Sequence, residues 1–253
     1  MTSHNDTVVD QFTRQATPFA NAAAMRDEEA LRLLVEFSHA SADDTVLDVA
    51  CGPGLVVAAF AKSSRRAVGI DLTPAMIEKA REHAAALGLA NVEWHVGNVA
   101  ALPFPDRSFS IVVSRFAFHH FVDPLGVLRE MKRVTTGRIV IADMVASDDP
   151  ARAAALNRME KLRDPSHART LTLAELRHLF AQAGLPAPRE TYYDVRGELE
   201  GLLATSFPAP EDIPVIREMF ADSLTDDGLG MKTKRKGDKI LLSYPIAILA
   251  ADL

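Results

Sequence analysis

The stretch VLDVACGPG, residues 46–54, decides the fold of this chain. An apolar run reaches Asp48 and then turns through Gly52, Pro53 and Gly54. Glycines permit positive φ angles and carry no side chain that would block a ligand. The helix that follows begins with free backbone N–H groups. The stretch therefore predicts a buried strand that ends at a ligand-binding turn.

Strand-like and helix-like patterns alternate on both sides of this stretch. Such alternation requires crossover connections, which predict an α/β fold with a mostly parallel sheet and helices on both faces. Seven strands are expected, at 45–50, 66–71, 92–98, 109–116, 137–145, 190–195 and 239–251.

Three segments divide the 253 residues, a length that favours a single core with insertions. Residues 1–38 are expected to form a helical lid segment, and residues 39–145 the ligand-binding core. Residues 146–253 complete the sheet and include a helical substrate cap at about 198–228.

Composition excludes several classes of protein. A net charge of −6 argues against a nucleic-acid partner, and one cysteine rules out an internal disulfide. We predict no metal site. No secretion signal is visible, and no window approaches the roughly 20 apolar residues that span a membrane. We expect a cytoplasmic protein without membrane contact.

Polar groups end the first three predicted strands. Asp48 ends the first, Asp71 ends the second, 17 residues after Gly54, and Asn98 ends the third. A carboxylate such as Asp71 suits the two hydroxyls of a ribose, and the Asn98 carbonyl can accept from an adenine amino group. Because the carboxyl ends of parallel strands meet at one edge, the sequence predicts an adenosine-containing ligand there.

A dinucleotide fits this site poorly. The G-x-G-x-x-G fingerprint needs a third glycine where Val57 stands, and Asp48 would repel a pyrophosphate. The same carboxylate attracts an ammonium group. Adenosine joined to a cationic amino-acid tail describes S-adenosylmethionine.

Four segments carry a family resemblance: VLDVACGPG, VGIDLTPAMIEKAR, VGNVAALPFPDRSFSIVVSRFAFHHFVDP and GRIVIADMV. Together they resemble the class I S-adenosylmethionine-dependent methyltransferases. The likeness is greatest to the branch with the ubiquinone/menaquinone C-methyltransferases and bacterial small-molecule methyltransferases. It covers residues 40–145 closely and the last two strands loosely. It implies a Rossmann-like fold, S-adenosylmethionine as cofactor and S-adenosylhomocysteine as product.

The resemblance implies which residues face the methionine part of the cofactor. The turn at Gly52 and Gly54 receives it, with Asp48 nearby. Ser114 and Arg115, after the fourth apolar run, flank the methionine tail and the sulfonium.

The adenosine end is assigned in the same way. Asp71 holds the ribose, Leu72 lines the adenine pocket, and Asn98 and the backbone of Val99 contact the adenine edge. The family usually has Asp where Asn98 stands. The amide keeps an acceptor and loses the charge, so adenine recognition is expected to survive.

Catalytic residues stay unknown from the sequence. His119 is the candidate base, because it follows the fourth strand near the expected acceptor and imidazole titrates near neutrality. The alternative is a histidine that satisfies a backbone carbonyl. Cys51 is expected to be a small filler, since direct methyl transfer needs no nucleophile on the enzyme.

Phe19, His119 and His167 are the candidate contacts of the methyl acceptor. His167 lies in RDPSHART (163–170), which resembles a segment of a bacterial subset of the family. Its alternative is a polar connection between helices. Apolar residues in the lid segments imply a small-molecule acceptor that is partly apolar or aromatic. The oligomeric state is left open.

The sequence thus predicts a methyltransferase acting on oxygen, nitrogen or carbon of a small molecule by direct displacement. A quinone-biosynthesis C-methyltransferase is one alternative, from which the 198–228 insertion and the RDPSH segment point away. A nicotinamide-dependent oxidoreductase and a non-catalytic donor-binding module are the alternatives from other classes.

Overall fold

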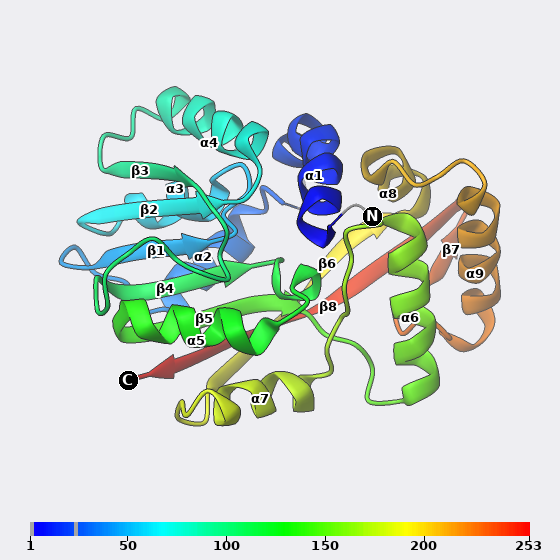
Figure 1. Ribbon diagram of the computed structural model, residues 1–253. Coiled ribbons are helices and arrows are strands. Elements are labelled where there is room, and N and C mark those ends of the chain that lie inside the picture. The colour runs from blue at the N-terminus through cyan, green and yellow to red at the C-terminus, as the bar shows by residue number, and fades with distance from the viewer. Residues whose placement is uncertain (1–2, 23–24) are drawn as a thin grey trace.

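One sheet runs through the protein in the computed structural model, which describes residues 3–22 and 25–253 (Figure 1). The strand order is β3-β2-β1-β4-β5-β8-β6, and β7 pairs with β8 alone. The strands are β1 Thr45–Val49, β2 Arg66–Asp71, β3 Val92–Val96, β4 Phe109–Arg115, β5 Thr135–Met144, β6 Arg189–Glu198, β7 Lys234–Lys236 and β8 Lys239–Asp252.

The direction of the strands confirms a mostly parallel, Rossmann-like sheet. Strands β1 to β5 pair in parallel, whereas β8 runs antiparallel to β5 and β6. The seven expected strands form the continuous path. The three-residue β7 is an addition that the sequence reading omitted.

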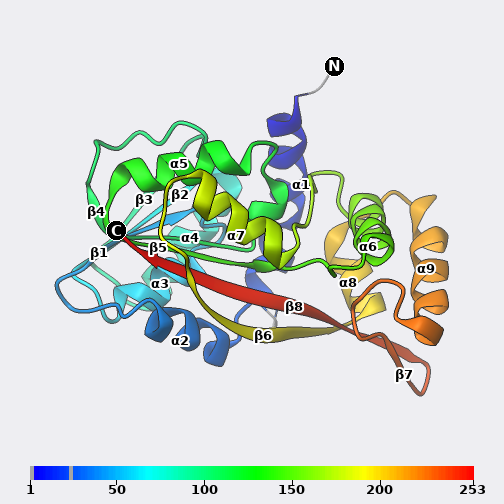
Figure 2. The same cartoon turned by 90° about the horizontal axis from the view of Figure 1, so that it is seen from below.

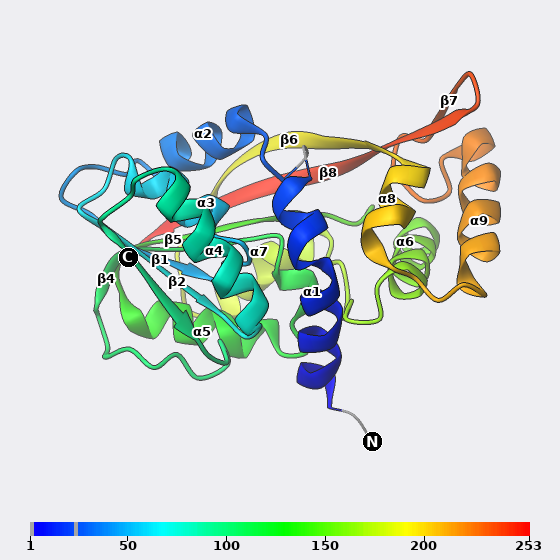
Figure 3. The same ribbon diagram turned by 90° about the horizontal axis from the view of Figure 1, so that it is seen from above.

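Helices cover both faces of the sheet. Figures 2 and 3 show α2, α3 and α4 on one face and α5 and α7 on the other. The helices are α1 His4–Asn21, α2 Glu28–Phe37, α3 Leu55–Ala61, α4 Pro74–Ala86, α5 Pro124–Val134, α6 Pro150–Arg163, α7 Leu173–Gln182, α8 Leu199–Ser206 and α9 Asp212–Asp226, with a 3-10 turn η1 at Phe118–His120. No helix within the described ranges is long and apolar enough to cross a membrane.

Local chemistry starts these helices where the chain needs them. Asp123 and Asp149 precede a proline and accept backbone N–H bonds from the first turns of α5 and α6. Thr172 and Glu175 form a reciprocal capping box at the start of α7. Each cap satisfies N–H groups that have no partner inside the helix.

Three apolar clusters hold the layers together. Two lie on the opposite faces of the sheet, under α5 with α7 and under α2 with α3. The third packs α6, α8 and α9 against the far half of β8, around the fully buried Ile216, Phe220 and Met231. The C-terminal helices therefore have an apolar core of their own beyond the end of the parallel strands.

Helix α1 stands between these two parts of the molecule, next to α4 on one side and α8 on the other (Figures 1 and 3). Two buried amides attach it to α8. Gln11 Nε2 donates to the carbonyl of Ser206 at 2.5 Å, and Gln15 Nε2 donates to the same carbonyl at 3.1 Å. The N-terminal segment thus closes over the ends of the strands.

Candidate active site

Two adjoining cavities lie at the carboxyl ends of the parallel strands. The first has a volume of about 480 Å³ and the second about 420 Å³. Five residues line both and form their common wall: Phe12, Phe19, Met25, Phe116 and His120. Two molecules bound in these cavities would therefore be neighbours.

The carboxylate of Asp71, at the end of β2, organises the turn after β1. Its Oδ2 accepts from the Gly52 N–H at 2.8 Å, and its Oδ1 accepts from the Thr73 N–H at 2.8 Å. Burial raises the pKa of Asp71, and these N–H bonds oppose the rise. Asp71 lines the first cavity and keeps lone pairs for a ligand, because each carboxylate oxygen accepts two bonds.

Asp48, in β1, is a buried carboxylate that lacks a hydrogen-bond partner. It is 2% exposed, and neither oxygen is bonded within the described part of the chain. Burial, followed by repulsion from Asp71, raises the pKa of Asp48 well above its ordinary value, and Arg115 opposes the rise. Leaving a buried polar group unpaired is costly, so a cationic group in the first cavity would complete this site.

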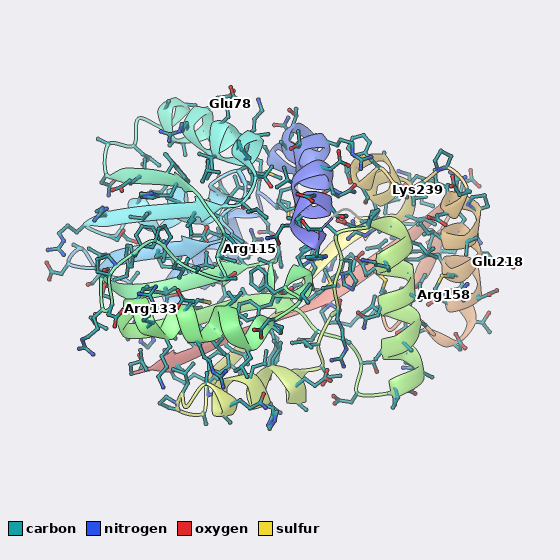
Figure 4. All side chains as sticks on the ribbon, in the orientation of Figure 1. Glu78, Arg115, Arg133, Arg158, Glu218 and Lys239 are labelled. Carbon is teal, nitrogen blue, oxygen red and sulfur yellow. The ribbon has the colours of Figure 1, made fainter. Side chains whose placement is uncertain are left out.

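Arg115, the last residue of β4, supplies the opposite charge. Its Nη1 donates to the Met25 carbonyl at 3.0 Å and its Nε to the Tyr193 hydroxyl at 3.4 Å. Figure 4 labels Arg115 beside the strand ends near α1. Its Nη2 is buried and has no partner among the described residues. A guanidinium N–H of this kind suits a carboxylate.

Asp48 and Arg115 show whether the charged groups of the first cavity match those of S-adenosylmethionine. An unpaired carboxylate and an unpaired guanidinium nitrogen match the ammonium and carboxylate of an amino-acid tail. Gly52 has a φ of +50°, and a Cβ added there would meet no atom within 4 Å, so the turn leaves room beside the cavity. The residues present fit the cofactor.

Two of the nine expected cofactor residues lie away from the cavity. Gly54 has a φ of +77°, but an added Cβ would sit 2.4 Å from Trp94 Cη2, so this glycine makes room for protein packing. Ser114 is fully buried, and its hydroxyl donates to the Val49 carbonyl at 2.8 Å. Neither residue lines either cavity. The structure therefore does not bring Gly54 or Ser114 into the lining of the cavity, and they are left out of the proposed cofactor site.

The remaining adenosine residues do line the first cavity: Leu72, Asn98 and Val99. Asn98 Oδ1 already accepts from the Ala100 N–H at 2.9 Å, so one carbonyl lone pair is left. Cys51 also lines the cavity, and burial foremost raises the pKa of its thiol well above the ordinary value. The protonated thiol agrees with a filler role.

The second cavity is assembled from segments far apart in the sequence. Its apolar wall comes from α1, the ends of β4 and β5, β6, α8 and β8, through Phe12, Phe19, Phe116, Met144, Val195, Leu202, Leu242 and Ile246. Of the C-terminal helices, α8 and the end of α6, through Arg163, contribute to the lining, whereas α9 packs on α6.

A histidine–carboxylate pair lies at this second cavity. His119 Nδ1 is 2.6 Å from Asp143 Oδ1, and both residues are buried. Burial lowers the pKa of His119, but the charge and hydrogen bond of Asp143 outweigh it, and the net pKa is raised. Since Nδ1 faces the carboxylate, Nε2 is the ring nitrogen left available. His119 lines the second cavity.

The other two histidines of this cluster differ from His119. His120 Nδ1 lies 3.0 Å from the Ser166 carbonyl, and burial lowers its pKa to about 3. His167 lines neither cavity. Its Nε2 lies 3.0 Å from Asn157 Oδ1, and burial lowers its pKa to about 4. The structure thus places His167 behind the cavity, with its ring 5.7 Å from the His119 ring between centroids, and it is left out of the proposed acceptor contacts.

Buried charges in the wall of the second cavity are paired. Arg163 donates to Glu160 Oε2, at 2.5 Å from Nη2, and to Ser206 Oγ at 3.0 Å. Tyr244 donates to Glu160 Oε1 at 2.6 Å. The RDPSHART segment thus reaches the cavity through Arg163 and Asp164.

Sequence reasoning missed Asp143, Glu160 and Tyr244 at this site. Asp143 had a signal, because it is the first charge after the apolar core of β5, as Asp48 is in β1. Glu160 and Tyr244 had none, because they meet across 84 positions of sequence.

Comparisons with known proteins identify related methyltransferases. Residues 40–184 match the family model described as a methyltransferase domain. The uncharacterized methyltransferase YcgJ of Bacillus subtilis is 37% identical over 174 residues, 65% of this chain and 69% of YcgJ. The ubiquinone/menaquinone biosynthesis C-methyltransferase UbiE of Enterobacter is 32% identical over 118 residues, 44% of this chain and 47% of UbiE.

Solved structures share nearly the whole fold. The crystal structure of YcgJ aligns with a TM-score of 0.82 and 26% identity, over 88% of this chain and 97% of that one. A putative methyltransferase from Bacillus halodurans aligns with a TM-score of 0.82 and 25% identity, over 88% and 98% of the two chains. The likeness therefore includes elements outside residues 40–184.

Proposed function

The chain belongs to the methyltransferase domain family and is a class I S-adenosylmethionine-dependent methyltransferase, and on this premise we propose that it methylates a small, largely apolar molecule held in the second cavity. The cofactor supplies an electrophilic methyl group on a sulfonium. Membership of the family sets aside the oxidoreductase and the non-catalytic module as alternatives. The common wall of the two cavities is the observation that carries the proposal.

Seven residues are proposed to hold the cofactor in the first cavity. Asp48 and Arg115 pair with the ammonium and carboxylate of its methionine end, since each has an unpaired buried atom. Asp71 binds the ribose hydroxyls, and the open turn at Gly52 lets the ligand approach. Leu72, Asn98 and Val99 surround the adenine.

The second cavity suits a small acceptor by size and by chemistry. Its volume of about 420 Å³ lies in the range of small-molecule sites. Its lining is largely apolar, the Arg163 charge is paired with Glu160, and the other lining arginine, Arg196, is exposed to solvent, so no unpaired buried charge calls for a charged acceptor. Holding the nucleophile beside the methyl carbon and excluding water are the main contributions of the chain's own residues.

A quinone acceptor remains the alternative within the class. UbiE, named for ubiquinone/menaquinone biosynthesis, matches less than half of this chain. The second cavity takes part of its wall from α1 and α8, outside the matched methyltransferase domain of residues 40–184. The acceptor therefore depends on parts of the chain that the family model does not cover.

A mass-shift screen tests the proposal. The protein with S-adenosylmethionine is incubated with phenols, amines and a demethylmenaquinol analogue, and a gain of one methyl group is sought in each. We expect at least one small acceptor to be methylated. Methylation of the quinol analogue alone would favour the alternative, and no turnover of any small molecule would contradict the proposal.

A cavity-filling variant locates the acceptor. Leu202→Trp fills the second cavity from α8, so we expect loss of methylation with donor affinity unchanged by calorimetry. Leu87→Trp is the matched control, because Leu87 is 47% exposed and lines neither cavity. Full activity of Leu202→Trp would place the acceptor elsewhere.

A further inference from the structure

The His119–Asp143 pair is fixed on two neighbouring strand ends. Strand β5 carries Asp143, and η1, which carries His119, follows the paired strand β4. Asp143 Oδ1 also accepts from the Met144 N–H at 2.7 Å, and Oδ2 accepts from the His119 N–H at 3.2 Å. A carboxylate bonded in this way holds one imidazole tautomer and one ring orientation.

Among the clustered histidines, His119 alone combines a carboxylate partner with a place in the cavity lining. His120 lines both cavities, but its Nδ1 faces a backbone carbonyl, and a histidine with a pKa of about 3 is a poor proton acceptor. His167 lines neither cavity. A proton released in the second cavity is therefore best received by His119.

We propose that His119 is the general base of the methyl transfer, that Asp143 is its positioning residue, and that the acceptor atom is the weakly acidic hydroxyl oxygen of a phenol or an enol. This inference rests on the proposed function. The hydroxyl proton passes to His119 Nε2 while the oxygen forms its bond to the methyl carbon. The carbon–sulfur bond breaks, and its electron pair stays on sulfur as a neutral thioether.

The acceptor class follows from the need for a base. A neutral amine attacks through its own lone pair and needs no proton removed first. A hydroxyl oxygen becomes a strong nucleophile only as its proton leaves, and a buried histidine–carboxylate pair serves that step. The largely apolar lining of the cavity suits the aromatic or conjugated skeleton that makes such hydroxyls acidic.

Charged and titratable groups around His119 set its pH dependence. Asp143 faces it from β5, Glu160 and Arg163 from α6, His167 from the segment after α6, and His120 is its neighbour in η1. Burial and Arg163 lower the pKa of His119, whereas Asp143 and Glu160 raise it above 6.5 overall. Since the base must be neutral, kcat/KM should rise with pH through this raised pKa and then level.

Three probes test the acceptor class: 2-naphthol and 4-phenylphenol as weakly acidic hydroxyls, and 2-naphthylamine as an amine with the naphthol skeleton. We expect turnover of at least one hydroxyl probe, and a loss of about 100-fold or more in kcat for His119→Gln. Donor affinity should be unchanged. His178→Gln, on the exposed side of α7, is the matched control and should keep full activity.

Asp143→Asn shows whether Asp143 positions His119 for catalysis or only stabilises the fold. Without the carboxylate charge the pKa of His119 falls, so the rising limb of kcat/KM should move to lower pH while its plateau drops. Nuclear magnetic resonance of the histidine rings in the ligand-free protein gives a second measure. The signal lost in His119→Gln should titrate above 6.5 in the native chain and lower in Asp143→Asn.

Different failures point to different conclusions. Full kcat of His119→Gln on a hydroxyl probe, methylation of the amine alone, or an unmoved pH limb in Asp143→Asn would overturn the inference and leave the proposed function intact. No turnover of the three probes, with other small acceptors methylated in the screen, would also overturn it. A native protein that methylates no small molecule contradicts the proposed function itself.

Discussion

The two cavities are built in opposite ways. The polar side chains proposed to hold the cofactor in the first cavity lie at or just after strand ends between Asp48 and Arg115, within 68 consecutive positions inside the matched methyltransferase domain. The second draws its wall from residues between Phe12 and Ile246, nearly the whole chain. A cofactor site common to a family can thus be compact in sequence, whereas the acceptor site depends on how distant segments pack.

Their buried aspartates show the same difference. Asp48 has no hydrogen-bond partner within the described residues, which supports the proposal that the ammonium group of the cofactor pairs with it. Asp143 is bonded to the His119 ring and to two backbone N–H groups, so the protein itself completes it. This difference supports the proposals that the first cavity binds a charged group and that the second holds a proton acceptor in place.

Asp71→Ala is expected to have the largest effect on ligand binding, and it changes the first cavity alone. The variant loses charged hydrogen bonds to the ribose and to the Gly52 turn, so donor affinity should fall about 100-fold or more. Calorimetric titration with S-adenosylmethionine measures the effect. Asp43→Ala, at an exposed position, is the control. Unchanged affinity in Asp71→Ala would remove the ribose assignment.

Asp48→Asn should separate binding from stability. Losing the partner of the ammonium group weakens donor binding about 10-fold, a cost of about 1.4 kcal/mol. The ligand-free protein should nevertheless become more stable at pH 8. The folded pKa of Asp48 is raised, so the stability that the protonated carboxyl contributes at low pH is lost as pH rises through that pKa.

Thermal unfolding at pH 8 and at pH 4 measures this gain. Each kcal/mol should raise Tm by about 2–4 °C at pH 8, and the gain should shrink at pH 4, where the carboxyl is more protonated. Asp143→Asn is the comparison and should lower Tm, because it weakens a bonded buried pair. A lower Tm of Asp48→Asn at pH 8 would mean that Asp48 is not an uncompensated charge.

The two turn glycines sharpen the comparison further. Gly54→Ala places a Cβ 2.4 Å from Trp94 at a positive φ, so the free energy of unfolding should fall by about 2–4 kcal/mol. Gly52→Ala meets open space, so it should lose only about 1–2 kcal/mol from the positive φ. Urea unfolding measures both. Equal losses would contradict the different roles of the two glycines.

Phe19→Ala should give the smallest loss of affinity, and the loss should be similar for donor and acceptor. Phe19 lies in the common wall, so its loss should weaken donor and acceptor alike, each by about fivefold, close to 1 kcal/mol. Leu202→Ala, which touches the second cavity alone, should raise only the acceptor KM. A Phe19 variant that affects one substrate and spares the other would show that the wall is not shared.

Side-chain direction explains which of the expected residues line the first cavity and which do not. Asp48, Asp71 and Asn98 were expected at one edge because parallel strands end together, and the structure places all three in the first cavity. Gly54 and Ser114 belong to the same motifs, yet the contacts of Gly54 with Trp94 and of Ser114 with Val49 direct them into the protein. A sequence motif fixes where a residue lies along the chain, whereas packing fixes the direction in which its side chain points.

The sequence by itself determined the sheet, the helix starts and the cofactor edge, because strand periodicity, capping residues and a glycine turn act over a few neighbouring positions. Tertiary structure alone decided the second cavity, the pairing of His119 with Asp143 across 24 positions, and the attachment of α1 to α8 across 195. Such contacts depend on which distant surfaces meet when the chain buries its apolar side chains, and no local pattern records that outcome.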